Sequence, residues 1–144
     1  MSAHQILTFA GTDPALKQYE DYLFVTYLKS LRYGNEWFKA IDAKIYYQVH
    51  HQGFENLLKR PQALIKLAVL SDDPDIVISW ALIEGKTLHY VHTKANIEAR
   101  RLGIAKSLIP NDIDTITHLT KIGLAIFKKY QKKIKFNPYQ GEIS

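Results

Sequence analysis

Hydrophobic and polar residues follow one another along this chain in patterns that predict both helices and strands. A short apolar run at 6–9 indicates a strand that ends at Gly11. Asp13 and Pro14 then predict a helix start, because aspartate caps free backbone N–H groups and proline suits the first helical position. The next apolar residues are spaced by three and four, which is typical of one buried helix face. They are Leu16, Tyr19, Leu23, Tyr27 and Leu31, and Gly34-Asn35 is the expected end.

A second helix is expected from Trp37 to about Lys59. Gly53 falls where the apolar pattern changes phase, so we expect a break there. Pro61 ends the segment, because proline cannot continue a helix. Both tryptophans, Trp37 and Trp80, are expected in the core. The apolar positions of the helix are Phe38, Ile41, Ile45, Val49, Phe54, Leu57 and Leu58.

Three apolar, β-like runs follow at 63–70, 76–83 and 87–93. The turn at 72–75 and the tight turn at 84–86 contain Asp, Pro and Gly, which supply turn dihedrals. Short turns between consecutive strands predict an antiparallel meander.

The last third predicts a helix from near Gly103 to Pro110, a strand at 113–119, a helix at 122–133 and a strand at 134–136. The expected element order is therefore β, α, α, β, β, β, α, β, α, β. This order predicts a single mixed α/β domain without internal repeats.

Composition narrows the class of protein. The chain has 144 residues, the size of one domain, and no cysteine, which excludes disulfides, thiolate metal sites and a cysteine nucleophile. No run has the length of a membrane span or the pattern of a signal peptide, so we expect a soluble cytoplasmic protein that does not bind membranes.

Charge is concentrated in the last third of the chain. The net charge is +5, from 19 Lys and Arg against 14 Asp and Glu, and residues 101–144 carry eight basic and three acidic residues. A basic surface attracts nucleotide cofactors, nucleic acid or an acidic partner. The same lysines also fit a solvated helix face.

The stretch at 86–108 combines a strand, a polar connection, two arginines, a glycine and a helix start. Its centre reads Arg100-Arg101-Leu102-Gly103-Ile104-Ala105. Small residues let the backbone approach a pyrophosphate, and the free N–H groups of a helix start attract anions. Arginine adds a charged hydrogen-bond donor. The stretch therefore predicts a phosphate-binding site.

This motif and the element order resemble the GNAT superfamily of acyl-CoA-dependent N-acetyltransferases. The segments LFVTYLKSLRYG and HYVHTK…RRLGIA also resemble small GNAT-like proteins of tailed phages. The resemblance implies one GNAT-like domain over residues 1–144, with a mixed, mostly antiparallel sheet flanked by about four helices. It also implies acetyl-CoA as cofactor and a small-molecule or protein amine as acceptor.

The resemblance places the cofactor in a gap between the strands at 87–93 and 113–119. The backbone near Thr93 would bind the thioester and pantetheine arm, and the helix start would bind the pyrophosphate. The cofactor-binding residues implied are Thr93, Arg100, Arg101, Leu102, Gly103, Ile104, Ala105 and Lys106.

The chain departs from the family pattern in three ways. The connection from Thr93 to Arg100 spans seven residues and is longer than usual. No carboxylate lies on the strand at 87–93, where many members have a glutamate base. The helix at 122–133 lacks the usual Asn-x-x-Ala start and Tyr-x-x-x-Gly-Phe end. The sequence therefore supports cofactor binding better than catalysis.

Transfer to an amine requires a base and an acid for the leaving thiolate. His89 and His92 are the candidate bases, and they are expected on opposite faces of the strand because side chains alternate, so only one can face the cleft. Either also fits a hydrogen-bonded position in or beside the core. Glu84, in a turn, is a weaker candidate. Tyr130 is the candidate acid, although it also fits the apolar face of its helix. His118 lies on the strand that would flank the cofactor.

Three functional hypotheses remain open from the sequence. The first is an N-acetyltransferase, and the second is a binding or structural module on the same fold without transfer activity. The third is a nucleic-acid-modifying enzyme, which the basic last third permits. No metal site is expected, because adjacent residues on a helix, as at His50-His51, point in different directions.

Overall fold

The computed structural model describes residues 4–94, 102–118, 120–130 and 133–141. The chain begins with β1 (His4–Ala10), a 3-10 turn η1 (Pro14–Tyr19) and the helices α1 (Glu20–Tyr33), α2 (Glu36–Ala40) and α3 (Ala43–Leu58). It continues with β2 (Ala63–Leu70), β3 (Val77–Glu84), β4 (Thr87–Thr93) and α4 (Leu102–Leu108). It ends with β5 (Thr115–Ile116), α5 (Lys121–Tyr130), β6 (Lys135–Phe136) and a 3-10 turn η2 (Pro138–Gly141).

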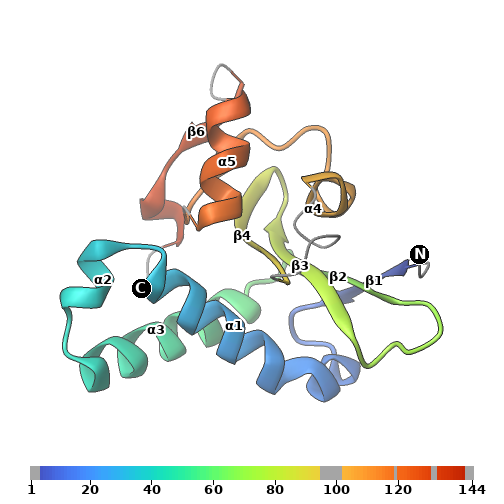
Figure 1. The fold of residues 1–144 in the computed structure, drawn as a ribbon, viewed down its shortest axis with the longest axis horizontal. Coiled ribbons are helices and arrows are strands. Elements are labelled where there is room, and N and C mark those ends of the chain that lie inside the picture. Colours follow the sequence, from blue (N-terminus) through green and yellow to red (C-terminus); the bar gives the residue numbers. More distant parts are fainter. Residues whose placement is uncertain (1–3, 95–101, 119, 131–132, 142–144) are drawn as a thin grey trace.

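All six strands form one sheet in the order β1-β2-β3-β4-β5-β6 (Figure 1). β2, β3 and β4 form the antiparallel meander that their short turns predict, and Gly85 takes a positive φ in the turn between β3 and β4. β1 also pairs antiparallel with β2, although η1 and three helices separate the two strands in sequence. β5 pairs parallel with β4, and β6 pairs parallel with β5. The predicted mixed, mostly antiparallel α/β sheet with flanking helices is confirmed.

The predicted start of the first helix is confirmed as a capped turn. The Asp13 side chain accepts a hydrogen bond from the backbone N–H of Ala15 at 2.9 Å, and Pro14 opens η1, which leads into α1. The aspartate thus satisfies one of the free donors of the helix start.

The second predicted helix is two helices, and the predicted break at Gly53 is wrong. α3 runs through Gly53, which is buried. The break lies between Ala40 and Ala43, where the Asp42 side chain accepts from Ile45 N–H at 3.3 Å and starts a new helix. An aspartate cap inside a continuous apolar pattern therefore decided the boundary.

Two hydrophobic clusters lie on the two faces of the sheet. The α1 side contains residues of α1 and α3 packed on Leu67, Trp80 and Tyr90. The α4 side contains residues of α4 and α5 packed on Leu88 and Val91. Figure 1 shows these helices on opposite sides of the sheet.

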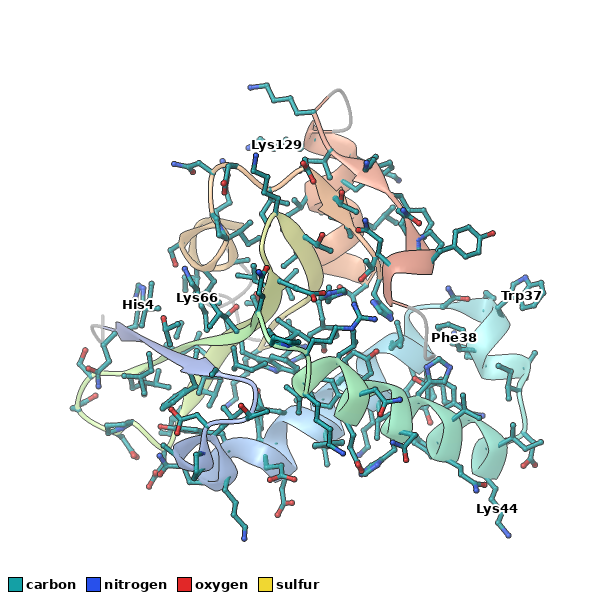
Figure 2. All side chains as sticks on the ribbon, turned by 180° about the vertical axis from the view of Figure 1, so that it is seen from behind. His4, Trp37, Phe38, Lys44, Lys66 and Lys129 are labelled. Carbon is teal, nitrogen blue, oxygen red and sulfur yellow. The ribbon has the colours of Figure 1, made fainter. Side chains whose placement is uncertain are left out.

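The two tryptophans differ from the expectation that both are buried. Trp80 is fully buried in the cluster on the α1 side. Trp37 is 81% exposed on α2 and points away from the protein (Figure 2), so the prediction for Trp37 is wrong. α2 is a short helix with no buried residue, and it leaves this ring without a surface to pack on.

The predicted strand at 113–119 is much shorter in the structure. β5 contains only Thr115 and Ile116, because the chain leaves β4 after these residues. Within the described residues, no helix is long and apolar enough to cross a membrane.

Candidate functional site

β4 and the segment that follows β5 separate after one short stretch of parallel pairing. The last paired residues are Leu88 and Ile116, and Thr117 N–H still donates to Leu88 C=O at 3.2 Å. Beyond this point, side chains replace backbone donors. His118 Nδ1 lies 3.0 Å from the His89 carbonyl oxygen. We call the two diverging parts, residues 89–93 on one side and residues 117–118 with Thr120 on the other, the fork.

Thr120 makes a similar bond further along the fork. Its hydroxyl donates to the Val91 carbonyl oxygen at 3.2 Å. Side-chain donors therefore satisfy two carbonyl groups of β4 that a regular parallel neighbour would have paired with its backbone. In the fork, a side chain rather than a backbone hydrogen bond therefore connects the two segments.

β4 contains a bulge at the start of the fork. Leu82 pairs with Tyr90 and Ile83 pairs with Leu88, so His89 is an extra residue in β4. A bulge inserts one residue, breaks the alternation of side chains and increases the local twist. Strict alternation, from which the sequence placed His89 and His92 on opposite faces, therefore does not hold here.

A row of hydrogen-bonded polar side chains runs from the β3–β4 turn past this bulge to α1, and we call it the polar chain. Its members, in order, are Arg60, Glu84, His89, Thr117, His118 and Tyr27. The polar chain begins with Arg60 and Glu84, which are both partly exposed. Arg60 Nη1 donates to Glu84 Oε1 at 3.0 Å. His89 Nε2 lies 2.8 Å from the same oxygen, and the His89 side chain is only 1% exposed.

In the inner half of the polar chain, His89 and Thr117 are buried and His118 is partly buried. His89 Nδ1 lies 2.9 Å from Thr117 Oγ1, and this oxygen lies 2.8 Å from His118 Nδ1. His118 Nε2 then lies 3.3 Å from the hydroxyl of Tyr27 on α1. The polar chain therefore connects the β3–β4 turn, the fork and α1.

The acceptors of the polar chain determine where its protons lie. A carboxylate accepts only, so Glu84 requires a proton on His89 Nε2. The His89 carbonyl also accepts only, so His118 Nδ1 carries a proton. In neutral rings the other nitrogens then accept, from Thr117 O–H and from Tyr27 O–H. This assignment leaves every nitrogen of the two rings with a partner.

Burial keeps both histidines of the polar chain neutral. It lowers the pKa of His89, although the Glu84 carboxylate opposes this shift, and it lowers the pKa of His118 to about 4. Burial alone would raise the pKa of Glu84, but its hydrogen bonds with His89 and Arg60 lower it below its ordinary value. Glu84 is thus ionised and is balanced by Arg60.

Glu84, His89 and Thr117 have the order of a carboxylate, a base and a nucleophile. Thr117, however, is only 2% exposed. The C-terminal turn covers it, because a Cβ built on Gly141 would lie 3.1 Å from Thr117 Oγ1 and 2.7 Å from His118 Cε1. A substrate carbonyl has no access to this hydroxyl, so we assign the three groups a structural role.

His92 has a different environment from His89. It is partly exposed, and burial lowers its pKa below the ordinary value, which makes it neutral near pH 7. Its ring lies parallel to that of Tyr90, with 6.4 Å between the ring centres. Within the part of the chain that the structure describes, His92 forms no side-chain hydrogen bond. It is therefore the candidate base with free ring nitrogens.

The remaining predicted residues of the site are Thr93 and Tyr130. Thr93 ends β4 and is buried, with its hydroxyl 3.1 Å from that of Ser79. Tyr130 ends α5, but its side chain lies outside the described part of the protein. Its predicted role as an acid therefore stays a prediction.

The predicted phosphate-binding segment is described only from its helix onward. Arg100 and Arg101 lie outside the described residues, and Leu102 is the first residue of α4. Gly103 is exposed, and a Cβ built on it would meet no atom within 4 Å, so the backbone of this turn is open to a ligand. Ala105 is fully buried and lets α4 pack closely on the sheet.

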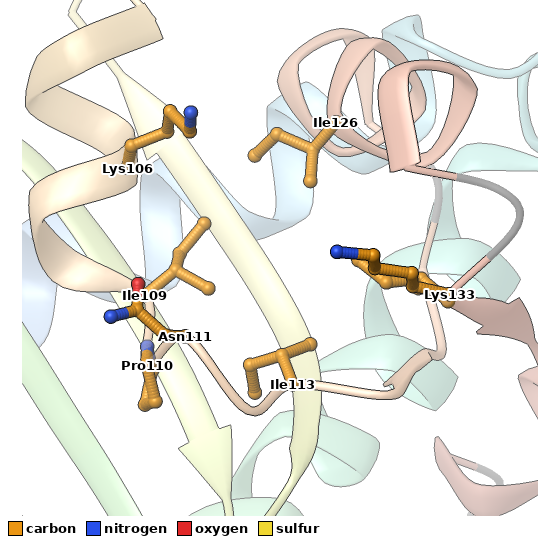
Figure 3. A pocket seen from close by; sticks show the side chains of 8 residues that line it. Lys106, Ile109, Pro110, Asn111, Ile113, Ile126 and Lys133 are labelled. Atoms are coloured by element: carbon orange, nitrogen blue, oxygen red, sulfur yellow. The ribbon is translucent and has the colours of Figure 1, made fainter.

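Lys106 lies toward the other end of α4, beside a pocket between α4 and α5 (Figure 3). The pocket has a volume of about 220 Å³. Its lining consists of Lys106, Ile109, Pro110, Asn111, Ile113, Ile126, Lys133 and Ile134. It lies at the C-terminal end of α4, and none of its lining residues belongs to the fork. We therefore treat the pocket and the fork as separate features.

The sequence did not single out Arg60 or Thr117, and it named Glu84 only as a weaker candidate base. Glu84 was placed in a turn, yet it ends β3 and contacts His89 across that turn. The five-residue spacing of these two groups around Gly85 is the one signal the sequence contains. Nothing in the sequence connects Thr117 or Tyr27 with His89.

No protein-family model matches the chain, and no curated protein is significantly similar to it. Among solved structures, the fold is similar to the crystal structure of ribosomal-protein-alanine N-acetyltransferase from Brucella melitensis biovar Abortus 2308. The TM-score is 0.50 and the identity is 13%, over 99% of this chain and 97% of that chain. At this identity the likeness concerns the fold alone, and the chain accordingly has a GNAT-like fold.

Proposed function

We propose that this protein is an acyl-CoA-dependent N-acetyltransferase that acts on an amine. The observation that carries the proposal is the fork, where the backbone pairing of β4 with the segment after β5 ends at Leu88 and Ile116. In the proposal, the extended arm of the cofactor lies beside β4 beyond the side-chain bonds of the fork. The order of elements, the motif and the fold likeness support this assignment.

The proposed cofactor fits the residues that are described. The open backbone at Gly103 suits a pyrophosphate, since no side chain intervenes and the first N–H groups of a helix are unpaired. Arg100 and Arg101 would add charge-assisted hydrogen bonds. Acetyl-CoA would supply an acetyl group activated as a thioester.

In this proposal His92 is the base that takes a proton from the acceptor ammonium. A neutral imidazole with free nitrogens can accept a proton, and burial keeps His92 in this form near pH 7. His89 is less suitable, because both of its nitrogens are already bonded to Glu84 and Thr117. Tyr130 remains the proposed proton donor to the thiolate.

A protein amine is the first acceptor to test. The structural neighbour is named as an enzyme that acetylates an alanine of a ribosomal protein. A short peptide with a free N-terminal alanine is therefore a suitable probe, and the same peptide with a blocked N-terminus is its control. Release of free CoA thiol on addition of the free peptide alone would support transfer to an amine.

Cofactor binding is tested by thermal unfolding with acetyl-CoA. A ligand at about 100 times its dissociation constant should stabilise the fold by roughly 2.7 kcal/mol. Gly103→Asp should abolish this stabilisation, because it places a carboxylate at the phosphate site. Ser107→Asp, which adds the same charge further along α4, should keep most of it. No stabilisation of the unaltered protein by acetyl-CoA or CoA would refute the proposal.

A second function is favoured by the exposed lysines of the last third. Lys128, Lys129, Lys133 and Lys135 are all exposed, and Figure 2 shows Lys129 at the edge of the molecule. If this surface binds nucleic acid, the affinity should fall steeply with salt and on neutralising these lysines. Binding that is insensitive to salt would contradict it. Binding of CoA without transfer would instead support the module without catalytic activity.

A further inference from the structure

The bulge at His89 decides which face of the sheet the rest of β4 presents. Inserting one residue in a strand moves every later side chain to the other face. Leu88 and Val91 are three residues apart, yet both belong to the cluster on the α4 side. Tyr90 belongs to the cluster on the α1 side, and the His92 ring lies parallel to it. His92 lies on the α1 side because of the bulge.

The polar chain stabilises this bulge through both the backbone and the side chain of His89. The inserted residue of a bulge is normally left unpaired. Here the His89 carbonyl accepts from His118 at 3.0 Å. The His89 ring is held at both nitrogens, by Glu84 at 2.8 Å and by Thr117 at 2.9 Å. The cost of an irregular residue in the sheet is thereby offset by three hydrogen bonds.

We propose that Glu84, Thr117 and His118 are positioning residues for His92: they hold the bulge at His89 and thereby keep His92 on the α1 side of the sheet. The proposal deepens the proposed function, since it rests on His92 as the base. In the described part of the protein, no hydrogen bond or ring contact joins any of the three residues to His92. Their influence passes through the backbone of β4.

The C-terminal turn completes this arrangement. Arg60 Nη1, which pairs with Glu84, also donates to the Gln140 carbonyl oxygen at 2.8 Å. Gly141 then packs against His118 and Thr117 with no room for a Cβ. Water is therefore kept from the inner bonds, where it would compete with them.

Within the part of the protein that the structure describes, the polar chain has these charged and titratable groups around it. His89 faces Glu84 and Arg60. His118 faces His89 and His50, with Tyr27 at its other nitrogen. His92 faces Tyr90. A change in the titration of His92 after a change at Thr117 thus has no direct electrostatic explanation, because the threonine hydroxyl carries no charge.

The test is proton–nitrogen NMR of the histidine rings in the full-length protein. The unaltered protein should show His89 as the Nε2–H form, His118 as the Nδ1–H form and His92 as neutral near pH 7. Thr117→Val removes the central hydroxyl at nearly unchanged shape. We expect the pH midpoint of the His92 titration to move toward the ordinary pKa of histidine, because a loosened bulge exposes the ring to solvent.

Thr115→Val is the matched control. Thr115 is equally buried, lies on the same segment and loses a hydroxyl bond to Asp114 at 2.8 Å, but it lies outside the polar chain. It should leave the His92 midpoint unchanged. Glu84→Ala should shift the His92 titration in the same direction as Thr117→Val. Glu84→Gln should give nearly the same spectrum as the unaltered protein, because its amide oxygen can still accept a hydrogen bond from His89.

The outcomes separate this proposal from the proposed function. A His92 midpoint that is unchanged in both Thr117→Val and Glu84→Ala would overturn it, as would an equal change in Thr115→Val. These spectra require no cofactor, so failure of acetyl-CoA to bind would refute the transferase but leave the positioning result standing. If transfer is observed, Thr117→Val should lower kcat at least tenfold and leave the KM for acetyl-CoA within about twofold.

Discussion

Acid should destabilise this protein through His118. The pKa of His118 is lowered to about 4 by burial, whereas an unfolded chain has an ordinary histidine pKa of about 6.5. Between these two values the unfolded state binds a proton that the folded state does not bind. The stabilising effect of the neutral ring is therefore complete above about pH 6.5 and is lost as the pH falls toward 4.

The magnitude follows from the difference between the two pKa values. At about pH 5 this ring is almost fully protonated in the unfolded state and mostly neutral in the folded state. The free energy of unfolding is therefore about 2 kcal/mol lower than at neutral pH. His50, His89 and His92 also have pKa values lowered by burial, so they act in the same direction. A comparison of the unaltered protein with the variant His118→Gln isolates the contribution of the His118 ring to this pH dependence.

The assay is urea unfolding at several pH values, followed by the fluorescence of the buried Trp80. His118→Gln should be less stable than the unaltered protein near neutral pH, and the difference should shrink by about 2 kcal/mol on going to about pH 5. His4→Gln, which changes an exposed histidine on β1, is the control. A difference between the protein and His118→Gln that stays constant with pH would refute the reasoning.

Two further substitutions test the packing that holds the fold. Gly11→Ala should lower the free energy of unfolding by more than about 2 kcal/mol, because its Cβ would lie 2.2 Å from the Leu58 carbonyl oxygen. Gly103→Ala is the control and should not lower it, because its Cβ meets open space. Tyr46→Phe should cost about 1–2 kcal/mol, because the buried hydroxyl donates to the Leu28 carbonyl at 2.6 Å. Urea unfolding measures both; an unchanged stability in Gly11→Ala or in Tyr46→Phe would contradict the corresponding contact.

Much of the secondary structure is determined by local sequence. The runs at 63–70 and 87–93 form β2 and β4 with the predicted bounds, since apolar strands between tight turns have few alternatives. Asp13 and Pro14 start the first helical segment as predicted, because a cap depends only on its neighbours. The break at Asp42 rather than Gly53 shows the limit of this reasoning, since two local signals competed and the aspartate cap prevailed.

The candidate site was predicted only in part. The strand at 87–93 was predicted with its observed bounds. The phosphate-binding role of the motif at 100–105 stays a prediction, because Arg100 and Arg101 lie outside the described residues. His92 and His89 could be named as candidates but not distinguished. The structure separates them, since His89 has a partner at each nitrogen and His92 has none among the described residues.

The sequence alone determined the α/β class, the meander and the capped start of the first helical segment, because each depends on residues that are close along the chain. Only the tertiary structure decided the bulge at His89, the face on which His92 lies and the polar chain from Arg60 to Tyr27. These features join residues up to 91 positions apart. Register and long-range hydrogen bonds arise only when separate strands meet, and no local pattern specifies them.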